Sequence, residues 1–240
     1  MRSFKHIEIY YYPEHETLYW SLKKYGIPNL CQEGLKEFLE FSTWMQEYFA
    51  DPLHPLKYVV AISEHDDIFS LGGDLPFFVE SIKNRQFKAL KEYAHIAVKA
   101  IHEMYNSFHL PIITIALVNG KAYGGGVELA LAHDHIIASP NAQFALPESK
   151  YNLFPGMGAY SLLQRKLTYL EANQILTGDQ MMSTEFMLEK GLVTQLATED
   201  GYMDVIYLFI KEHLKGFNFE YYHQKSMKTI YNISLEELQN

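Results

Sequence analysis

Two glutamates and two glycine turns supply the residue types that acid–base chemistry on a carbonyl compound requires. Glu128 follows three glycines in AYGGGVELAL (122–131), and Glu148 follows a proline in FALPES (144–149). Another glycine turn, SLGGDL (70–75), lies upstream. Glycine turns after successive strands bring bare backbone N–H groups to one side of a sheet, where they can hold an oxyanion. Carboxylates among apolar neighbours are seldom buried without a purpose or a partner.

Each of these features also has a structural interpretation, and spacing alone leaves both open. The glycines can form tight turns, and Glu128 can be a charge that the helix dipole stabilises in a first turn. A third glycine turn, LFPGMGAY (153–160), opens another predicted helix. None of the three fits a dinucleotide-binding G-x-G-x-x-G loop. We interpret Asp74 and Asp134, which follow apolar segments, as structural hydrogen-bond acceptors.

Several other chemistries are excluded by absent motifs. The chain contains no HExxH, CxxC, GxxxxGK[ST] or GxSxG sequence. Its eleven histidines show no helical metal-ligand spacing, so we expect no metal, and His133 and His135 are interpreted as structural. Cys31 is the only cysteine, which excludes an intrachain disulfide and suits a reducing compartment. We interpret this cysteine, at a helix start, as structural.

Length, composition and the lack of a targeting segment predict a globular protein of the cytoplasm, within the size range of one large domain. The 240 residues are 48% hydrophobic and 20% charged, which excludes a disordered chain. No apolar run reaches the roughly 20 residues that span a bilayer, and the N-terminal segment lacks the apolar region of a signal peptide. The formal net charge of −9 argues against binding to nucleic acid or to an anionic membrane.

The elements that must position the glutamates alternate between strands and helices. Aromatic and β-branched runs at 6–12 and 17–23 predict a hairpin, and short apolar runs predict buried strands at 57–63, 112–118 and 135–139. Helical spacing predicts helices over the ranges 30–49, 86–107, 125–133, 159–167, 183–191 and 201–215. This alternation indicates an α/β fold with crossover connections.

A basic segment interrupts the acidic chain between residues 81 and 99. It carries five cations and one acid, Glu92, a local balance of +4; the cations are Lys83, Arg85, Lys88, Lys91 and Lys99. A solvated helix face is one interpretation, and a docking surface for a phosphate-bearing or acidic partner is the other. Because the segment follows SLGGDL, the second interpretation places it near the mouth of a pocket.

Between about residues 57 and 200 the chain resembles the crotonase (enoyl-CoA hydratase/isomerase) superfamily. The resemblance is carried by SLGGDL, ALVNGKAYGGGVELALAHDHIIASPNAQFALPE, LFPGMGAYSLL and ILTGDQMMSTEFMLEKGLV, which occur in family order. It implies the ClpP/crotonase-like spiral of ββα units over 1–200, followed by a helical segment, 201–240, shorter than in relatives. Within the superfamily, LGGDL, LPE and NLFPGMGAYS resemble the diffusible signal factor synthases most.

The resemblance implies roles for individual residues. Gly73 and Gly125 match the two halves of the family's oxyanion hole, and Glu128 and Glu148 match its two catalytic glutamates. The neighbouring substrate-binding candidates are Leu71, Gly72, Tyr123, Gly124, Lys83 and Arg85. Tyr123 departs from the aliphatic residue of the relatives and can narrow the pocket, donate a hydrogen bond or simply pack.

The implied activity is dehydration of a 3-hydroxyacyl thioester, followed by thioester hydrolysis to a cis-2-unsaturated fatty acid. A simple enoyl-CoA hydratase or isomerase is the first alternative, and a non-catalytic crotonase-fold binding protein is the second. No cofactor is expected beyond the coenzyme A or phosphopantetheine that the substrate carries, on coenzyme A or on acyl carrier protein. The resemblance further implies a homotrimer or a dimer of trimers.

Overall fold

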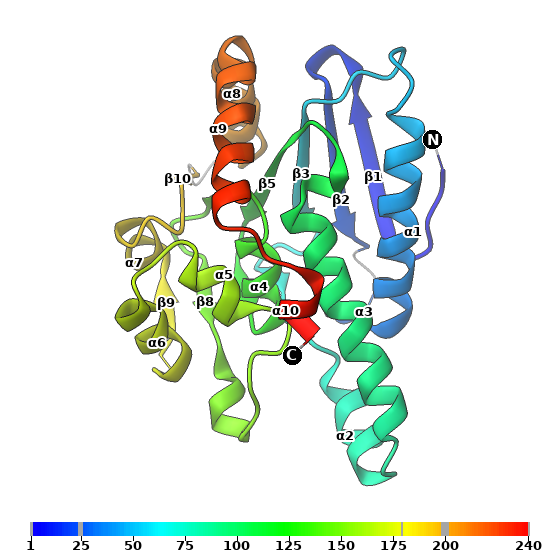
Figure 1. Cartoon of the computed structure of the whole chain (residues 1–240), viewed down its shortest axis with the longest axis vertical. Coiled ribbons are helices and arrows are strands. Elements are labelled where there is room, and N and C mark those ends of the chain that lie inside the picture. Colours follow the sequence, from blue (N-terminus) through cyan, green and yellow to red (C-terminus); the bar gives the residue numbers. More distant parts are fainter. Residues whose placement is uncertain (1, 24–25, 179, 198–201, 240) are drawn as a thin grey trace.

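Two sheets of different size form the framework of the chain (Figure 1). The computed structural model describes residues 2–23, 26–178, 180–197 and 202–239. In that part of the chain the larger sheet has the order β1-β2-β3-β5-β7-β10, with β1 and β2 antiparallel and the other pairs parallel. Its strands are β1 (Ile7–Tyr12), β2 (Thr17–Leu22), β3 (Tyr58–Ser63), β5 (Ile113–Val118), β7 (His135–Ala138) and β10 (Gln195–Leu196).

The smaller sheet is built from short strands, three of which directly follow strands of the larger sheet in the chain. It has the order β4-β6-β8-β9, parallel except for the β8–β9 pair. Its strands are β4 (Ile68–Ser70), β6 (Lys121–Tyr123), β8 (Gln143–Ala145) and β9 (Met182–Ser183). The pairs β3–β4, β5–β6 and β7–β8 are each followed by helical segments, so the chain repeats a ββα unit. This repeat agrees with the α/β fold of ββα units that the sequence predicts.

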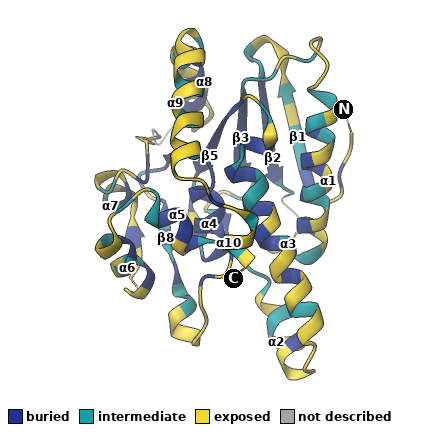
Figure 2. Cartoon of the chain, viewed as in Figure 1, coloured by how far each residue is buried: buried dark blue, intermediate teal, exposed yellow. Residues whose placement is uncertain are grey.

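Helices cover both faces of the larger sheet. The buried strands alternate their side chains, so Val59 and Ala61 pack toward α1 (Gln32–Tyr48) and α3 (Phe87–Tyr105). Tyr58 and Val60 face the opposite cluster, to which α8 (Tyr202–His213) and α9 (Phe217–Ile230) contribute. Buried residues lie along the strands and on the inner helix faces, whereas the outer helix faces are exposed (Figure 2). Strands covered on both sides read as continuous apolar runs, as those at 57–63 and 112–118 do.

Side chains cap the first turns of several helices. Asp74 accepts a hydrogen bond from the Phe77 N–H at the start of α2, and Thr168 forms a capping box with Glu171 in α6. Cys31 caps α1 by accepting from the Gly34 N–H, which confirms its structural position at a helix start. The elements not yet given are α2 (Leu75–Lys83), α4 (Gly125–Leu131), α5 (Ala159–Gln164), α6 (Tyr169–Thr177), α7 (Thr184–Glu189), α10 (Leu235–Gln239) and the 3-10 turns η1 (Pro13–His15), η2 (Ser107–His109), η3 (Pro147–Tyr151) and η4 (Leu214–Gly216).

The predicted elements are observed, but the structure also contains elements that the residue pattern did not predict, namely the helices α2, α6, α9 and α10 and the strand β10. The hairpin, the three buried strands and the predicted helices all form, although residue 201, the expected start of the last helix, lies outside the described residues. The segment 81–99 is not one helix face, because α2 ends at Lys83 and Arg85 has a φ of 54° in the turn before α3. The four short strands of the smaller sheet were not predicted. In the described part of the chain, no helix combines the length and apolarity needed to cross a bilayer.

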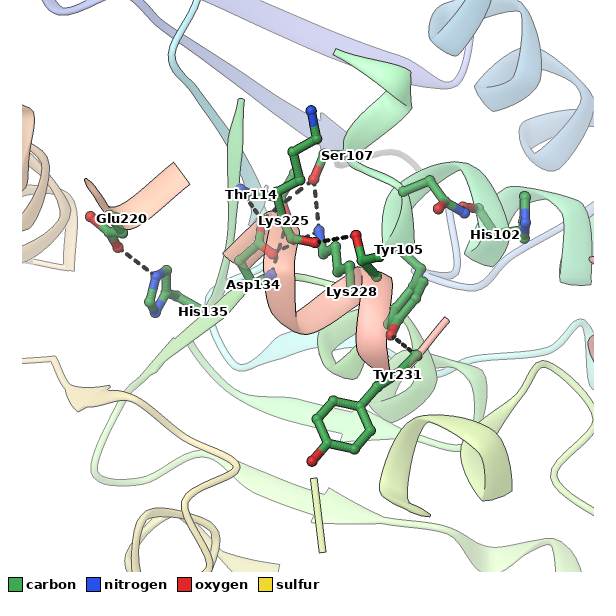
Figure 3. A network of polar contacts seen from close by, with 12 residues as sticks. His102, Tyr105, Ser107, Thr114, Asp134, His135, Glu220, Lys225, Lys228 and Tyr231 are labelled. Carbon is green, nitrogen blue, oxygen red and sulfur yellow. Dashed lines mark hydrogen bonds and ion pairs between the residues drawn. The ribbon is translucent and has the colours of Figure 1, made fainter. Parts of the chain in front are cut away.

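A buried ion pair joins α9 to the sheet (Figure 3). The Lys228 ammonium lies 2.7 Å from Asp134 Oδ1 and 2.7 Å from the Ser107 hydroxyl oxygen. Asp134 Oδ2 accepts hydrogen bonds from the N–H and hydroxyl of Thr114 at 2.8 and 2.9 Å. The structural interpretation of Asp134 is thus confirmed. His135 lies 2.7 Å from Glu220 of α9 and forms a second contact between the same elements.

Candidate active site

The glycine turns of SLGGDL and AYGGGVELAL contact each other through their backbones in the folded chain. Gly72, which follows β4, has a φ of +75°, and a Cβ on it would lie 2.5 Å from the Tyr123 carbonyl oxygen and 2.6 Å from the Gly125 nitrogen. Only glycine allows this conformation and this approach together. The Leu30 N–H holds the turn at 70–75 by donating a hydrogen bond to the Gly72 carbonyl at 2.7 Å. The glycines therefore bring two distant turns into direct backbone contact.

Each turn presents a backbone N–H group without an acceptor. Neither the Gly73 N–H nor the Gly125 N–H donates a hydrogen bond to any described residue. Gly125 is the first residue of α4, so its N–H has no partner within the helix. Gly73 pairs with Leu30 only as an isolated bridge. Two free donors from adjacent turns form the kind of arrangement that can bind an oxyanion.

Glu128 is the most deeply buried carboxyl group of this region. It lies in the first turn of α4, is 1% exposed, and its Oε1 accepts hydrogen bonds from the Met157 and Ala159 N–H groups, both at 2.8 Å. Burial is the main cause that raises the pKa of Glu128, and the nearby Glu148 carboxylate adds to the rise; the amide donors oppose it, and the resulting pKa is about 8. The carboxyl group is therefore mostly protonated at neutral pH.

Glu148 approaches the same place from η3. Gly124 has a φ of +52°, and a Cβ there would lie 2.5 Å from Glu148 Oε1, so the missing side chain makes room for this carboxylate. Glu148 Oε2 is buried and has no hydrogen-bond partner among the described residues. Burial raises the pKa of Glu148 as well, while its own N–H opposes the rise. A buried carboxylate oxygen without a donor, close to a protonated carboxyl group, is suited to proton transfer.

A mainly apolar cavity of about 550 Å³ lies under α1, and neither glutamate is among its lining residues. Leu30 and Met157 line it, and both lie against the Cα of Gly125, where a Cβ would be 3.3 Å from Leu30 Cδ1 and 2.6 Å from Met157 Sδ. Its walls include Trp20, Leu35, Phe38 and Met104. The volume falls in the range of ordinary ligand pockets, and the lining suits an apolar chain.

The other candidate residues lie at different distances from the glutamates. Leu71, half-buried, donates its N–H to the Pro28 carbonyl and thus supports the first turn. The Tyr123 hydroxyl donates to Gln143 Oε1 at 3.1 Å, so its hydrogen bond goes to β8 rather than into the cavity. Lys83 and Arg85 are exposed at the corner between α2 and α3 and do not line the cavity.

Two parts of the arrangement were not predicted from the sequence. The Met157 and Ala159 N–H groups that hold Glu128 come from the third glycine turn, which was singled out only as a helix start. The Leu30 segment, which lines the cavity and pairs with Gly73, carried no signal at all. A glycine on each side of Met157 was the one available clue, since such a turn can expose consecutive N–H groups.

Comparisons with known proteins identify the family to which this chain is similar. The profile of the family described as enoyl-CoA hydratase/isomerase matches residues 49–237. Carnitinyl-CoA dehydratases of Citrobacter koseri and Salmonella agona are each 40% identical over 97 residues, or 40% of this chain. The matched segment spans only 37% of the length of these relatives.

Solved structures agree over nearly the whole chain. An enoyl-CoA hydratase from Bacillus halodurans has a TM-score of 0.81 at 23% identity, covering 98% of this chain and 90% of its own. DspI of Pseudomonas aeruginosa has a TM-score of 0.78 at 20% identity, covering 98% and 91%. At such identities these structures support the fold alone.

Proposed function

The chain belongs to the enoyl-CoA hydratase/isomerase family, and from that premise we propose that it dehydrates a 3-hydroxyacyl thioester to a 2-enoyl thioester. One observation carries the proposal: Glu128 and Glu148, both with raised pKa values, lie beside the free N–H groups of Gly73 and Gly125. The carnitinyl-CoA dehydratases, by their name, perform a dehydration on a coenzyme A ester, which supports the same reaction class.

The reaction divides the two glutamates into a base and an acid. With the thioester carbonyl oxygen held by the two N–H groups, the Glu148 carboxylate removes the C2 proton and the negative charge develops on that oxygen. The protonated Glu128 then donates its proton to the C3 hydroxyl, the C3–O bond breaks, and water leaves as the C2–C3 double bond forms. Hydration of an enoyl thioester is the reverse of these steps.

The environments of the carboxyl groups support this division. Glu128 has a pKa of about 8, so it holds a proton to give at neutral pH. Glu148 is only partly buried, and one of its oxygens has no donor among the described residues to satisfy it. Two acidic groups whose surroundings push their pKa values to different extents are a common basis for acid and base roles.

The cavity and the basic segment support an acyl thioester as the substrate. The apolar cavity beside Gly125 suits an acyl chain, and the substrate would bring its own coenzyme A or phosphopantetheine arm. Lys88 and Lys91 are exposed on α3, next to Lys83 and Arg85, and none of the four forms an ion pair with a described residue. We assign this surface to the acidic face of a carrier protein or to coenzyme phosphates.

Charge reversal tests that assignment. Lys88→Glu with Lys91→Glu should raise KM for a carrier-protein substrate, more at low salt than at high salt, and leave kcat nearly unchanged. Lys215→Glu, at an exposed position beside α9, is the matched control. An unchanged KM at low salt excludes this surface as the docking site.

Hydrolysis of the enoyl thioester to a cis-2-unsaturated acid is the finer part of the proposal. It rests on the resemblance of LGGDL, LPE and NLFPGMGAYS to the diffusible signal factor synthases. In that step the same two N–H groups hold a tetrahedral oxyanion while a glutamate positions the water. A homotrimer, the assembly expected by analogy with the family, is proposed with it and is checked by light scattering.

Product analysis separates the candidate activities. The protein is incubated with 3-hydroxyacyl thioesters on coenzyme A and on carrier protein, and the products are identified by mass spectrometry. Free unsaturated acid supports dehydration with hydrolysis, and an enoyl thioester without free acid supports a simple hydratase. Absence of turnover with every chain length and both carriers refutes the proposal and favours a non-catalytic binding protein.

Substitution of each glutamate tests its role. Glu128→Gln and Glu148→Gln should each reduce kcat by about 10²–10⁴-fold, because glutamine keeps the shape but transfers no proton. Glu212→Gln, at an exposed position on α8, is the control and should leave kcat unchanged. Full activity in either of the first two variants contradicts the assignment of that residue.

A further inference from the structure

Two histidines and a glutamate lie together near the C-terminal end of α3, among residues that the proposed reaction does not use. The residues are His102, Glu103 and His109, and one nitrogen or oxygen atom of each lies within 4.8 Å of the other two. His109 Nε2 is 3.5 Å from Glu103 Oε1, and the two imidazole rings have their centroids 6.3 Å apart. None of the three lines the apolar cavity.

A tight turn after α3 creates the cluster. The helix ends at Tyr105, and Ser107, Phe108 and His109 all have positive φ values, of 52°, 54° and 57°. This left-handed run turns the chain back, so that His109 lies beside the last turn of the helix. Phe108 is fully buried against Phe38 of α1, which holds the turn in place.

The carboxylate of Glu103 is oriented by a neighbour that leaves one oxygen available. Its Oε2 accepts a hydrogen bond from the Ser42 hydroxyl of α1 at 2.7 Å. Its Oε1 points toward His109 and accepts no hydrogen bond other than that contact from a described residue. Ligating carboxylates in metal sites are commonly held by such a second hydrogen bond, which fixes the direction of the free oxygen.

We propose that His102, Glu103 and His109 bind a zinc ion at the surface, with water completing the coordination. Two imidazole nitrogens and a carboxylate oxygen form a donor set that suits Zn²⁺, whose bonds to such ligands are about 2.0–2.2 Å long. Tetrahedral ligands are then roughly 3.3 Å apart, and side-chain rotation alone can close the present separations.

The position of the site indicates a structural effect. The ion would join the end of α3 to η2, the turn that leads into β5, and through Glu103 it would act on α1. No metal was expected from the sequence, because the histidines show no ligand spacing within one helix. The third ligand, His109, belongs to the turn after the helix.

Zinc binding is measured on the full chain, freed of any histidine tag and stripped of metal with a chelator. Titration with ZnCl₂ in a calorimeter should give saturable binding of one ion, and Co²⁺ should give the visible absorption of a tetrahedral complex. At a hundredfold excess of Zn²⁺ over Kd, the Tm should rise by about 5–10 °C. Neither readout depends on catalysis.

Single substitutions identify the ligands. His102→Ala, Glu103→Gln and His109→Ala should each weaken zinc binding by more than about tenfold, and the metal-free Tm of His109→Ala should stay unchanged because that side chain is half exposed. His95→Ala, an exposed histidine on the same helix, is the control and should bind zinc normally. Absence of saturable binding, or binding that persists in the His102→Ala/His109→Ala double variant, overturns the proposal.

Discussion

The ion pair between Lys228 and Asp134 should hold α9 on the sheet, and Lys228→Met tests how strongly. Asp134 has a side chain only 1% exposed, and the Lys228 side chain is 20% exposed. Two charges 2.7 Å apart attract each other by about 6 kcal/mol at an effective dielectric constant of 20. The cost of removing both charges from water offsets much of this attraction.

The net effect of the substitution follows from what is left behind. Methionine fills the space of the lysine stem, so the main loss is that Asp134 becomes a buried charge without its cation. Such losses cost about 3–5 kcal/mol. Asp134 keeps its hydrogen bonds from Thr114, which places the expected loss of unfolding free energy near the lower end, at about 3 kcal/mol.

Urea denaturation at pH 7 gives the measurement, followed by circular dichroism and by the fluorescence of the buried Trp20. Lys225→Met, an exposed lysine on the same helix, is the control and should change the unfolding free energy by less than about 0.5 kcal/mol. Adding Asp134→Asn to Lys228→Met should recover at least about 1 kcal/mol, since no unpaired charge remains. Equal, small effects of the two lysine variants refute the reasoning.

The effect should also depend on pH in one direction. Burial alone raises the pKa of Asp134, but the Lys228 ammonium and the Thr114 N–H together hold it below its usual value. The unfolded chain therefore binds the proton first as the pH falls, and the stabilisation is present above the unfolded pKa of about 3.9 and lost below it. The difference between the wild-type protein and Lys228→Met should shrink below about pH 4.

Three further predictions concern the candidate active site. Gly72→Ala should lower the unfolding free energy by at least about 2 kcal/mol more than Gly191→Ala, because both glycines have positive φ but only the first would press a Cβ against Tyr123 and Gly125; equal losses in urea denaturation contradict this. If Glu128 acts as the acid, kcat/KM for dehydration should fall above about pH 8, and a flat profile from pH 6 to 9 argues against that role. Since the pKa of Glu128 is raised on folding, wild-type stability should decline as the pH rises from 4.5, the ordinary pKa of a glutamate, to about 8. Glu128→Gln should lack this decline. At about 1.4 kcal/mol per unit of pKa shift, the variant should be more stable than the wild-type protein by a few kcal/mol at pH 8. A variant that is less stable at pH 8 contradicts the burial of a protonated acid.

The elements that the sequence predicted correctly are those with a local signal. The hairpin β1–β2 and the strands β3 and β5 appear as runs of aromatic and β-branched residues, and α1 and α3 appear as apolar stripes at helical spacing. The strands β4, β6 and β8 have three residues each, too few for any periodicity to register. The periodicity of the sequence therefore could not predict the smaller sheet, which carries the two glycine turns.

The residues of the candidate site also divide into those that have a local signal in the sequence and those that have none. Glycines at 72 and 124–126 and glutamates at 128 and 148 are singled out by type, because bare turns and carboxylates in apolar surroundings are unusual. The donors that hold Glu128, however, come from residues 29 and 31 positions further along the chain. Such contacts have no signature in a single sequence. The cluster of His102, Glu103 and His109 is local in the chain, and it was missed because the left-handed turn at 107–109 that brings His109 back to the helix was not predicted.

By itself, then, the sequence determined which groups can take part in chemistry and on which kinds of element they lie. Only the tertiary structure decided which turn faces which, and with that the ionisation of the two glutamates. The physical reason is that residue type and periodicity are local properties of the chain. A pKa depends on the water that folding removes and on charges and donors that folding brings near. Glu128 becomes a protonated acid because folding buries it and brings Glu148 near, although the N–H groups of the Met157 turn oppose the rise of its pKa.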